Sequence, residues 1–418
     1  MKRLLITLLV LSVVVSFASI SSATNGTNLI SIGPISRSMG GVGIAAPQDA
    51  ISAVFANPAA MCFGPYCPGS EVNFAGTMFM PKVKTKVNVG GMVTEADSHQ
   101  KVYGIPAFGL SVPITNKFPL LRFGIAAYGV SGLGVDYRNT PIDNPQGLGG
   151  FPLVAGEYTQ LQIMKFAPSL AYQPNENLSL GVAVHVDYAN LDLRGGSSFN
   201  YGLGVELGAL YKVNDAISLG ATYITPQSVK HSDVKDFNFD GRADTLSLES
   251  PQQIGVGIAV TPIPNVLLLE VDGKWVNWSD ATGYEDFDWD NQWVLAVGAQ
   301  FNPTKKLALR AGYNYGKNPV NEHNNFNGSS PVSVQGKTLP AYYYETFRIV
   351  GFPAIVQHHL TFGVGYELSN SFAISGGYMH AFQETVKEHG TDPSGMYPVT
   401  LESTLSEDSV EFGLTWRF

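Results

Sequence analysis

The chain has 418 residues, of which 14% are charged, against about 25% in ordinary soluble domains. Its 44% hydrophobic content excludes a disordered chain, and its 45 glycines follow no three-residue period, which excludes collagen. The net charge of −9 excludes a basic nucleic-acid-binding surface, so we expect no nucleic acid among the partners.

Residues 1–23 have the layout of a secretory signal peptide. Lys2 and Arg3 precede an apolar run from residue 4 to residue 17, and small residues ending at Ala23 provide a cleavage site. The run is shorter than the ~20 residues of a membrane-spanning helix, which argues against the alternative of a membrane anchor. No later stretch is long and apolar enough for such a helix, so we expect an exported chain without one.

Residues 24–70 are predicted to form a plug. Their central part, from Ser31 to Met61, is rich in small residues and nearly uncharged, and its glycines allow close packing. Pro58 restricts its own φ and holds Asn57 extended. A flexible periplasmic tail should be polar, whereas a segment folded inside a lumen should be compact and apolar. The composition therefore favours a plug.

The two cysteines, Cys62 and Cys67, lie in the sequence CFGPYC. In an oxidising compartment such a close pair is expected to form a disulfide, with reduced thiols as the alternative. The spacing is wider than that of a redox CxxC motif, and no nearby histidine or further cysteine completes a zinc site. We therefore predict no metal and no cofactor.

Residues 71–418 alternate apolar residues with small or polar ones, which predicts strands with two different faces. At the C-terminus, Val410, Phe412, Leu414, Trp416 and Phe418 oppose Glu411, Gly413, Thr415 and Arg417. Aromatic residues near strand ends on one face, and small residues with few charges on the other, are typical of a barrel with lipid outside and a polar lumen. Backbone groups in lipid must be satisfied internally, so we predict an all-β fold, a transmembrane antiparallel β-barrel.

Breaks in the alternation predict about fourteen strands. Six short turns are expected at 114–119, 174–177, 214–215, 262–265, 302–305 and 369–370. Seven polar loops, mostly longer, are expected near 88–102, 136–157, 195–198, 230–242, 279–290, 316–357 and 383–409. Short periplasmic turns and longer outer loops are typical of outer-membrane barrels, so we predict the outer membrane of a Gram-negative bacterium.

One of these loops has a partial calcium-binding pattern. Asp236, Asn238, Asp240 and Gly241 match the start of a calcium loop, but Ser247 occupies the position where glutamate is required. A calcium site and a solvated acidic loop remain alternatives.

Several motifs resemble the outer-membrane long-chain fatty-acid transporter family, whose relatives import toluene and xylene. The N-terminal motifs are GGVGIA at 40–45 and FANPAAM at 55–61; later ones are PQQIGVG at 251–257, WVNWS at 275–279, LRAGYNY at 309–315 and GYMH at 377–380. The resemblance implies a fourteen-stranded barrel with an N-terminal hatch, here the plug. It also implies that a hydrophobic ligand enters an apolar pocket and that hatch movement releases it sideways into the membrane. Asn57, Pro58 and Ala59 match the hatch motif and are expected to take part in gating.

An apolar pocket also makes physical sense, because burial stabilises a ligand by about 0.8 kcal/mol per CH₂ group. A fatty acid would further need a cation for its carboxylate. Alternation points Arg310 and Lys274 inward, and Arg348 precedes a strand; these are the three candidates. The alternative for each is pairing with carboxylates of the lumen.

We therefore predict passive uptake of long-chain fatty acids or aromatic hydrocarbons by a monomer in contact with outer-membrane lipid and lipopolysaccharide. No catalytic group stands out, so we expect no enzyme. The alternatives are a general porin and, with less support, an outer-membrane lipid or peptide hydrolase.

Overall fold

The computed structural model describes residues 24–65, 67, 69–115 and 118–418. The predicted signal peptide over residues 1–23 lies outside them. None of the described helices is long and apolar enough to cross a membrane.

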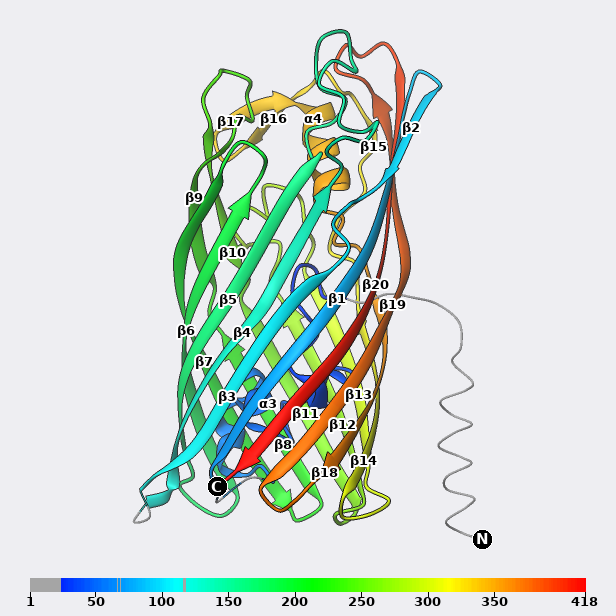
Figure 1. Cartoon of the computed structure of the whole chain (residues 1–418). Helices are drawn as coiled ribbons and strands as arrows, with labels where there is room; N and C mark the ends of the chain where they lie inside the picture. The colour runs from blue at the N-terminus through cyan, green and yellow to red at the C-terminus, as the bar shows by residue number, and fades with distance from the viewer. Residues whose placement is uncertain (1–23, 66, 68, 116–117) are drawn as a thin grey trace.

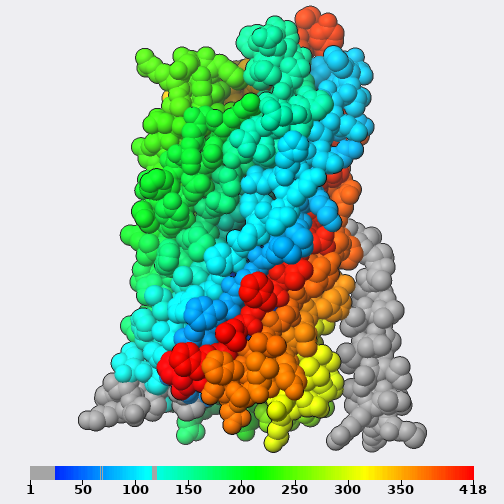
Figure 2. Space-filling view, viewed as in Figure 1, coloured from blue at the N-terminus to red at the C-terminus, as the bar shows by residue number. Residues whose placement is uncertain are grey.

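Fourteen antiparallel strands form one closed barrel wall in the described part of the chain. They are β1 (Glu71–Val89), β3 (Tyr103–Thr115), β4 (Phe118–Asp136), β5 (Tyr158–Tyr172), β6 (Leu178–Asp192), β7 (Ser197–Asn214), β8 (Ile217–Ile224), β11 (Gln253–Ile263), β12 (Leu267–Val276), β13 (Gln292–Phe301), β14 (Leu307–Gly316), β18 (His358–Glu367), β19 (Phe372–Thr391) and β20 (Pro398–Arg417). The last strand, β20, pairs with both β19 and β1 and so closes the wall, where the red strand lies against the blue one (Figure 2). The predicted antiparallel barrel is confirmed.

The alternation of β20 shows how the sequence determines the two faces of the wall. Phe412 is 68% exposed on the outer face, whereas its neighbour Glu411 is 2% exposed and points into the lumen. Phe372 and Trp416 stack on the outside with ring centroids 6.2 Å apart. Such outward aromatics near a strand end are typical of a membrane interface.

The short turns gather at the end of the barrel that also holds the C-terminus (Figure 1). The prediction of a loop over 383–409 is wrong, because β19 and β20 continue as a paired hairpin up to Thr391 and Pro398. Both faces of this hairpin carry polar residues, as in the ion pair of Lys387 with Glu402 at 3.4 Å. At this end of the hairpin the apolar residues, such as Leu401 and Leu405, point inward into an apolar cluster, whereas the outward face is polar. The outward apolar pattern therefore ends while the hydrogen-bonded ladder continues.

The long loops close the opposite end of the barrel. Their elements are β2 (Met92–Asp97), β9 (Gln227–Lys235), β10 (Asp244–Ser250), β15 (Asn324–Phe326), β16 (Pro331–Val334), β17 (Lys337–Pro340), α4 (Ala341–Thr346) and the π-helical turn η2 (Phe347–Gly351). All residues of α4 and η2 are buried, and Tyr342 and Phe347 belong to a large apolar cluster there. We call the segment formed by α4 and η2 the cap.

The N-terminal plug lies inside the lower half of the barrel, where the dark blue segment is seen in Figure 1. It contains α2 (Pro34–Arg37), α3 (Ala50–Ala56) and the 3₁₀ turn η1 (Pro58–Cys62). Asp49 begins α3 by accepting a hydrogen bond from the Ser52 amide at 2.9 Å, and the Ser52 hydroxyl faces back to the Asp49 amide as a capping box. The prediction of a plug in the lumen is confirmed.

Candidate functional site

A buried ion pair attaches the plug to the wall. Arg37 Nε lies 2.9 Å from Glu411 Oε1, and both side chains are 1% exposed. The same guanidinium donates from Nη1 to the carbonyl oxygen of Ser31 at 3.1 Å. Because a charge buried without its partner is costly, this pair strongly favours the docked plug over a displaced one.

Two carboxylates on β12 bind the plug backbone directly. Asp272 Oδ2 accepts hydrogen bonds from the amides of residues 43 and 44 at 2.8 and 3.0 Å. Glu270 Oε1 accepts from the amides of residues 45 and 46 at 2.7 and 3.0 Å. Hydrogen bonds to a charged acceptor are stronger than neutral ones, so these contacts fix the middle of the plug.

The predicted gating residues form a tight turn against the wall. Asn57 Oδ1 accepts from the Ala59 amide at 3.1 Å, and its Nδ2 donates to the Ala209 carbonyl oxygen at 3.0 Å. Pro58 begins the 3₁₀ turn that follows. The turn lies so close to β6 that this strand needs a glycine at the contact, since a Cβ at Gly181 would lie 2.2 Å from the Ala59 amide nitrogen. The structure places these residues as an anchor, and their role in gating stays a prediction.

The pairing of β3 with β4 stops partway along the wall. Ala107 and Tyr128 are the last partners at this end, and residues 103–106 of β3 pair only with β1. In β4, the register against β5 shifts between Gly129 and Ser131, which marks a β-bulge. Further along the chain, the His99 amide donates to the backbone oxygen of Asp136, at the end of β4. The stretch of β4 between these two contacts therefore presents a free edge, which we call the window.

The first residues of the plug lie along the window. The Leu29 amide donates to the Val130 carbonyl oxygen at 3.0 Å, and the Gly132 amide donates to the Thr27 carbonyl oxygen at 3.3 Å. Ser131 Oγ donates to the same Thr27 oxygen at 2.9 Å. Part of the free edge is thus satisfied by the plug, and a displacement of this short segment would uncover it.

A cavity of about 270 Å³ lies at the window. Its lining comprises Leu29 of the plug, Phe79, Pro81 and Val83 of β1, residues 103–106 of β3, Gly129 and residues 131–134 of β4, residues 162–164 of β5, and Leu405 and Glu407 of β20. On β3 the lining residues alternate between half-buried and exposed, and neighbouring strand residues point to opposite faces. The cavity therefore reaches both faces of the wall.

The three cations predicted to bind a carboxylate lie apart and line no part of this cavity. Arg310 donates from Nε to Gln300 Oε1 at 2.7 Å in the wall. Lys274 lines a smaller internal cavity of about 60 Å³ together with Lys165 and His185. The structure does not bring the three together, because alternation predicts the face of a residue but not its height in the barrel.

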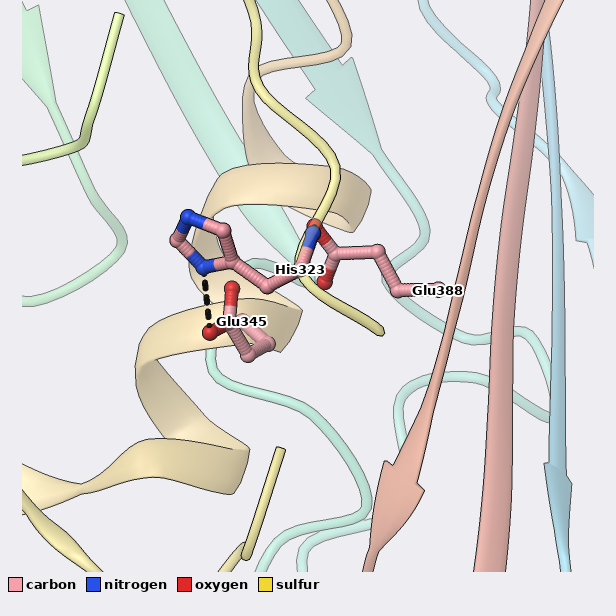
Figure 3. A group of neighbouring side chains, drawn as sticks. All are labelled: His323, Glu345 and Glu388. Carbon is pink, nitrogen blue, oxygen red and sulfur yellow. Dashed lines mark hydrogen bonds and ion pairs between the residues drawn. The ribbon is translucent and has the colours of Figure 1, made fainter. Parts of the chain in front are cut away.

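Arg348 lies in the cap, within a buried cluster of charged residues. It pairs with Glu345 and, at 3.1 Å, with Glu388 of β19. His323 Nδ1 lies 2.8 Å from Glu345 Oε1, a contact drawn as a dashed line in Figure 3. On the other side of the ring, Nε2 lies 2.7 Å from Asp288 Oδ2. The hydrogen bond with Glu345 raises the pKa of His323. This cluster joins two loops, one between β12 and β13 and one between β14 and β18, to β19 of the wall. The charge of Arg348 is therefore used in structural ion pairs.

The two cysteines are free thiols in this structure. Cys62 Sγ donates to the Leu120 carbonyl oxygen at 3.5 Å, and Arg122 Nη1 lies 3.9 Å from Cys67 Sγ. Since each thiol has a different partner, the disulfide is not formed here, and it stays a prediction for the exported protein.

The residues around the window were missed at the sequence level. One signal was available, because Pro106 cannot donate a ladder hydrogen bond and proline within a strand is confined to edges and bulges. The glycine-rich run over residues 129–134 of β4 was a second signal. The sequence gives no signal that Tyr103 and Glu407 line the same cavity, because their proximity depends on strand register.

The fold is shared with solved outer-membrane channels. The Pseudomonas putida toluene transporter TodX is 17% identical, with a TM-score of 0.64 over 93% of this chain and 99% of that chain. A Pseudomonas aeruginosa FadL homologue is 17% identical, with a TM-score of 0.66 over 95% and 99%. The Ralstonia pickettii toluene transporter TbuX is 17% identical, with a TM-score of 0.60 over 93% and 98%.

Family models add a sequence relationship. Residues 12–197 match the family described as outer membrane protein transport protein (OMPP1/FadL/TodX), and residues 163–334 match an outer membrane protein beta-barrel domain. No curated protein matches the chain. By the sequence match over residues 12–197, the closed barrel and its plug, the chain is similar to outer-membrane transport proteins of the OMPP1/FadL/TodX family and shares the fold of the solved channels.

Proposed function

We propose that the protein carries hydrophobic small molecules, long-chain fatty acids or aromatic hydrocarbons, passively across the outer leaflet and releases them sideways through the window. In this proposal residues 1–23 are a signal peptide, 24–70 the plug and 71–418 the barrel. The transported molecules of similar structures support the ligand class, since TodX and TbuX are toluene transporters.

The observation that carries the proposal is an apolar cavity at an unpaired wall edge. A continuous barrel wall leaves no path between strands, because every backbone group is paired with its neighbour. Here the pairing stops after Ala107 and Tyr128, and the cavity beyond has Phe79, Leu133 and Leu405 in its lining. Burial in such a cavity stabilises an apolar ligand by about 0.8 kcal/mol per CH₂ group relative to water.

The contacts of the plug indicate which part of it moves. Its middle is fixed by the Arg37–Glu411 ion pair and by the carboxylates of β12, whereas residues 27–29 reach the window through three hydrogen bonds. Neutral hydrogen bonds contribute only about 1 kcal/mol each, so the first segment costs the least to displace. We infer that this segment, and not the whole plug, opens the route to the membrane.

The test fills the cavity without breaking the barrel. In Gly129→Leu, the added side chain enters the lining, because a Cβ at Gly129 would lie 2.6 Å from Ile105 Cγ2. We expect uptake of labelled p-xylene by cells that depend on this channel to fall at least tenfold. Gly273→Leu is the matched control, since a Cβ at Gly273 has its nearest contact at 4.0 Å from Val256. Unchanged uptake in a folded, heat-modifiable Gly129→Leu barrel would refute the route.

A further inference from the structure

Two polar atoms in the lining of the cavity have no hydrogen-bond partner in the described part of the protein. They are Glu407 Oε2 and the Tyr103 hydroxyl oxygen, both fully shielded within the protein. Glu407 is 3% exposed, and it lies within electrostatic range of the Tyr103 hydroxyl. Buried polar groups are nearly always paired, so two such groups facing one apolar cavity point to a ligand that satisfies them.

The lining provides no cation for an anionic head group. The lining contains a carboxyl group and no lysine, arginine or histidine. Arg37, the plug cation that acts on Glu407, is already paired with Glu411 at 2.9 Å. A fatty-acid carboxylate in this cavity would meet Glu407 without a compensating cation, which is unfavourable in an apolar environment.

A neutral hydroxyl group has the opposite properties. Its O–H can donate to the free Glu407 oxygen, and its oxygen can accept from the Tyr103 O–H. The rest of the molecule can pack against Phe79, Leu133 and Leu405, which also line the cavity. We propose that Glu407 and Tyr103 are specificity-determining residues that select apolar molecules carrying one hydroxyl group, such as alkylphenols, over carboxylates and plain hydrocarbons.

This inference rests on the proposed function, the transport of hydrophobic small molecules, and selects among such molecules those that carry a hydroxyl group. Sites built to hydrogen-bond a hydroxyl group reject analogues that lack it, because the polar groups of the site are then left unpaired. The selectivity should therefore reside in Glu407 and Tyr103, whereas general affinity for apolar molecules should not depend on them.

The experiment uses three probes of the same shape: p-cresol, p-xylene and p-toluate. Their equilibrium binding to the purified full-length barrel in mild detergent is measured by titration calorimetry, and their uptake is measured in cells. We expect the wild type to bind p-cresol at least tenfold more tightly than p-xylene, and p-toluate most weakly. Glu407→Leu should reduce p-cresol binding at least tenfold, because the hydroxyl group of the probe loses its buried hydrogen-bond partner. Its p-xylene binding should not fall.

Two further variants test the individual hydrogen bonds. Glu407→Gln keeps a hydrogen-bond acceptor of similar size, so part of the preference for p-cresol should remain. Tyr103→Phe should weaken only p-cresol binding. Glu402→Gln is the matched control, because Glu402 lies on the same strand outside the cavity and pairs with Lys387. Heat-modifiable migration confirms that each variant folds.

The outcomes distinguish a failure of this inference from a failure of the proposed function on which it rests. If p-xylene is taken up through the window but p-cresol is not preferred, or if Glu407→Leu leaves the preference intact, water satisfies the two groups and the inference is wrong. If none of the three probes binds or enters, the proposed function itself fails.

Discussion

Removing Arg37 should loosen the plug while leaving the barrel closed. In Arg37→Leu, Glu411 keeps its buried position but loses the cation at 2.9 Å. Breaking a buried pair by removing one partner typically costs about 3–5 kcal/mol, because an uncompensated charge remains. The strand pairs that close the wall do not involve Arg37, so this cost falls on the docking of the plug.

The lost docking free energy can be measured from the rate of hydrogen exchange of the plug amides. If opening and closing are fast relative to exchange, a loss of about 3–5 kcal/mol accelerates exchange of residues 34–46 by roughly 10²- to 5 × 10³-fold. Mass spectrometry of the variant in detergent measures this, with the wall peptides as an internal control that should not change. The double variant Arg37→Leu with Glu411→Leu should recover most of the protection, since an apolar pair replaces a buried ion pair at little cost.

Two results would contradict this reasoning. Exchange of residues 34–46 at the wild-type rate in Arg37→Leu would mean that the ion pair contributes nothing to docking. Equal acceleration in the double variant would mean that the plug is loosened by changed packing and not by the unpaired carboxylate.

Further predictions concern the plug, the thiols and the cap. Asp272→Leu should destabilise the docked plug by about 3–5 kcal/mol, because two backbone amides lose a charged acceptor. Faster hydrogen exchange of residues 43–46 would show this loss, and exchange at the wild-type rate would contradict it. If Cys62 and Cys67 pair after export, the unfolded, unreduced protein should contain no reactive thiol, whereas two titratable thiols would exclude the disulfide. The raised pKa of His323 means that its contribution to the cap is complete below about pH 6.5 and is lost as the pH rises through the folded-state value. Protease cleavage within residues 341–351 should therefore increase at alkaline pH, and His323→Gln should remove this pH dependence; a pH dependence that persists in the variant would contradict it.

The fold was predictable because period-two alternation reports directly on the environment of each face. Phe412 and Glu411 occupy opposite faces as expected, since lipid and lumen demand opposite side chains. The end of the hairpin of β19 and β20 was missed because its outward face is polar there, whereas its apolar residues point inward. The plug was predictable from composition, because a segment rich in small residues and nearly uncharged can fold compactly inside a barrel; Arg37, its buried charge, pairs with Glu411 of the wall.

The site was less predictable because it depends on strand register and on height in the barrel. The three candidate cations all point inward or lie buried, yet they lie in three different parts of the protein: Arg310 in the wall, Lys274 at a smaller cavity and Arg348 in the cap. The window arises where the β3–β4 ladder stops, and a gap in pairing has no hydrophobic signature. Two features of the sequence pointed to it: Pro106, whose missing N–H is compatible with an edge, and the glycine-rich run over residues 129–134.

The central claim is that hydrophobic molecules leave through the window, and closing it reversibly tests this claim most directly. Pro106 and Gly129 are the next positions after the last pair, Ala107 and Tyr128, in the β3–β4 register. In a background of Cys62→Ser and Cys67→Ser, the double variant Pro106→Cys with Gly129→Cys can be joined by oxidation and separated by reduction. We predict that p-xylene uptake is lost in the oxidised protein and returns on reduction; equal uptake in both states, with the cross-link verified by mass spectrometry, would contradict the account.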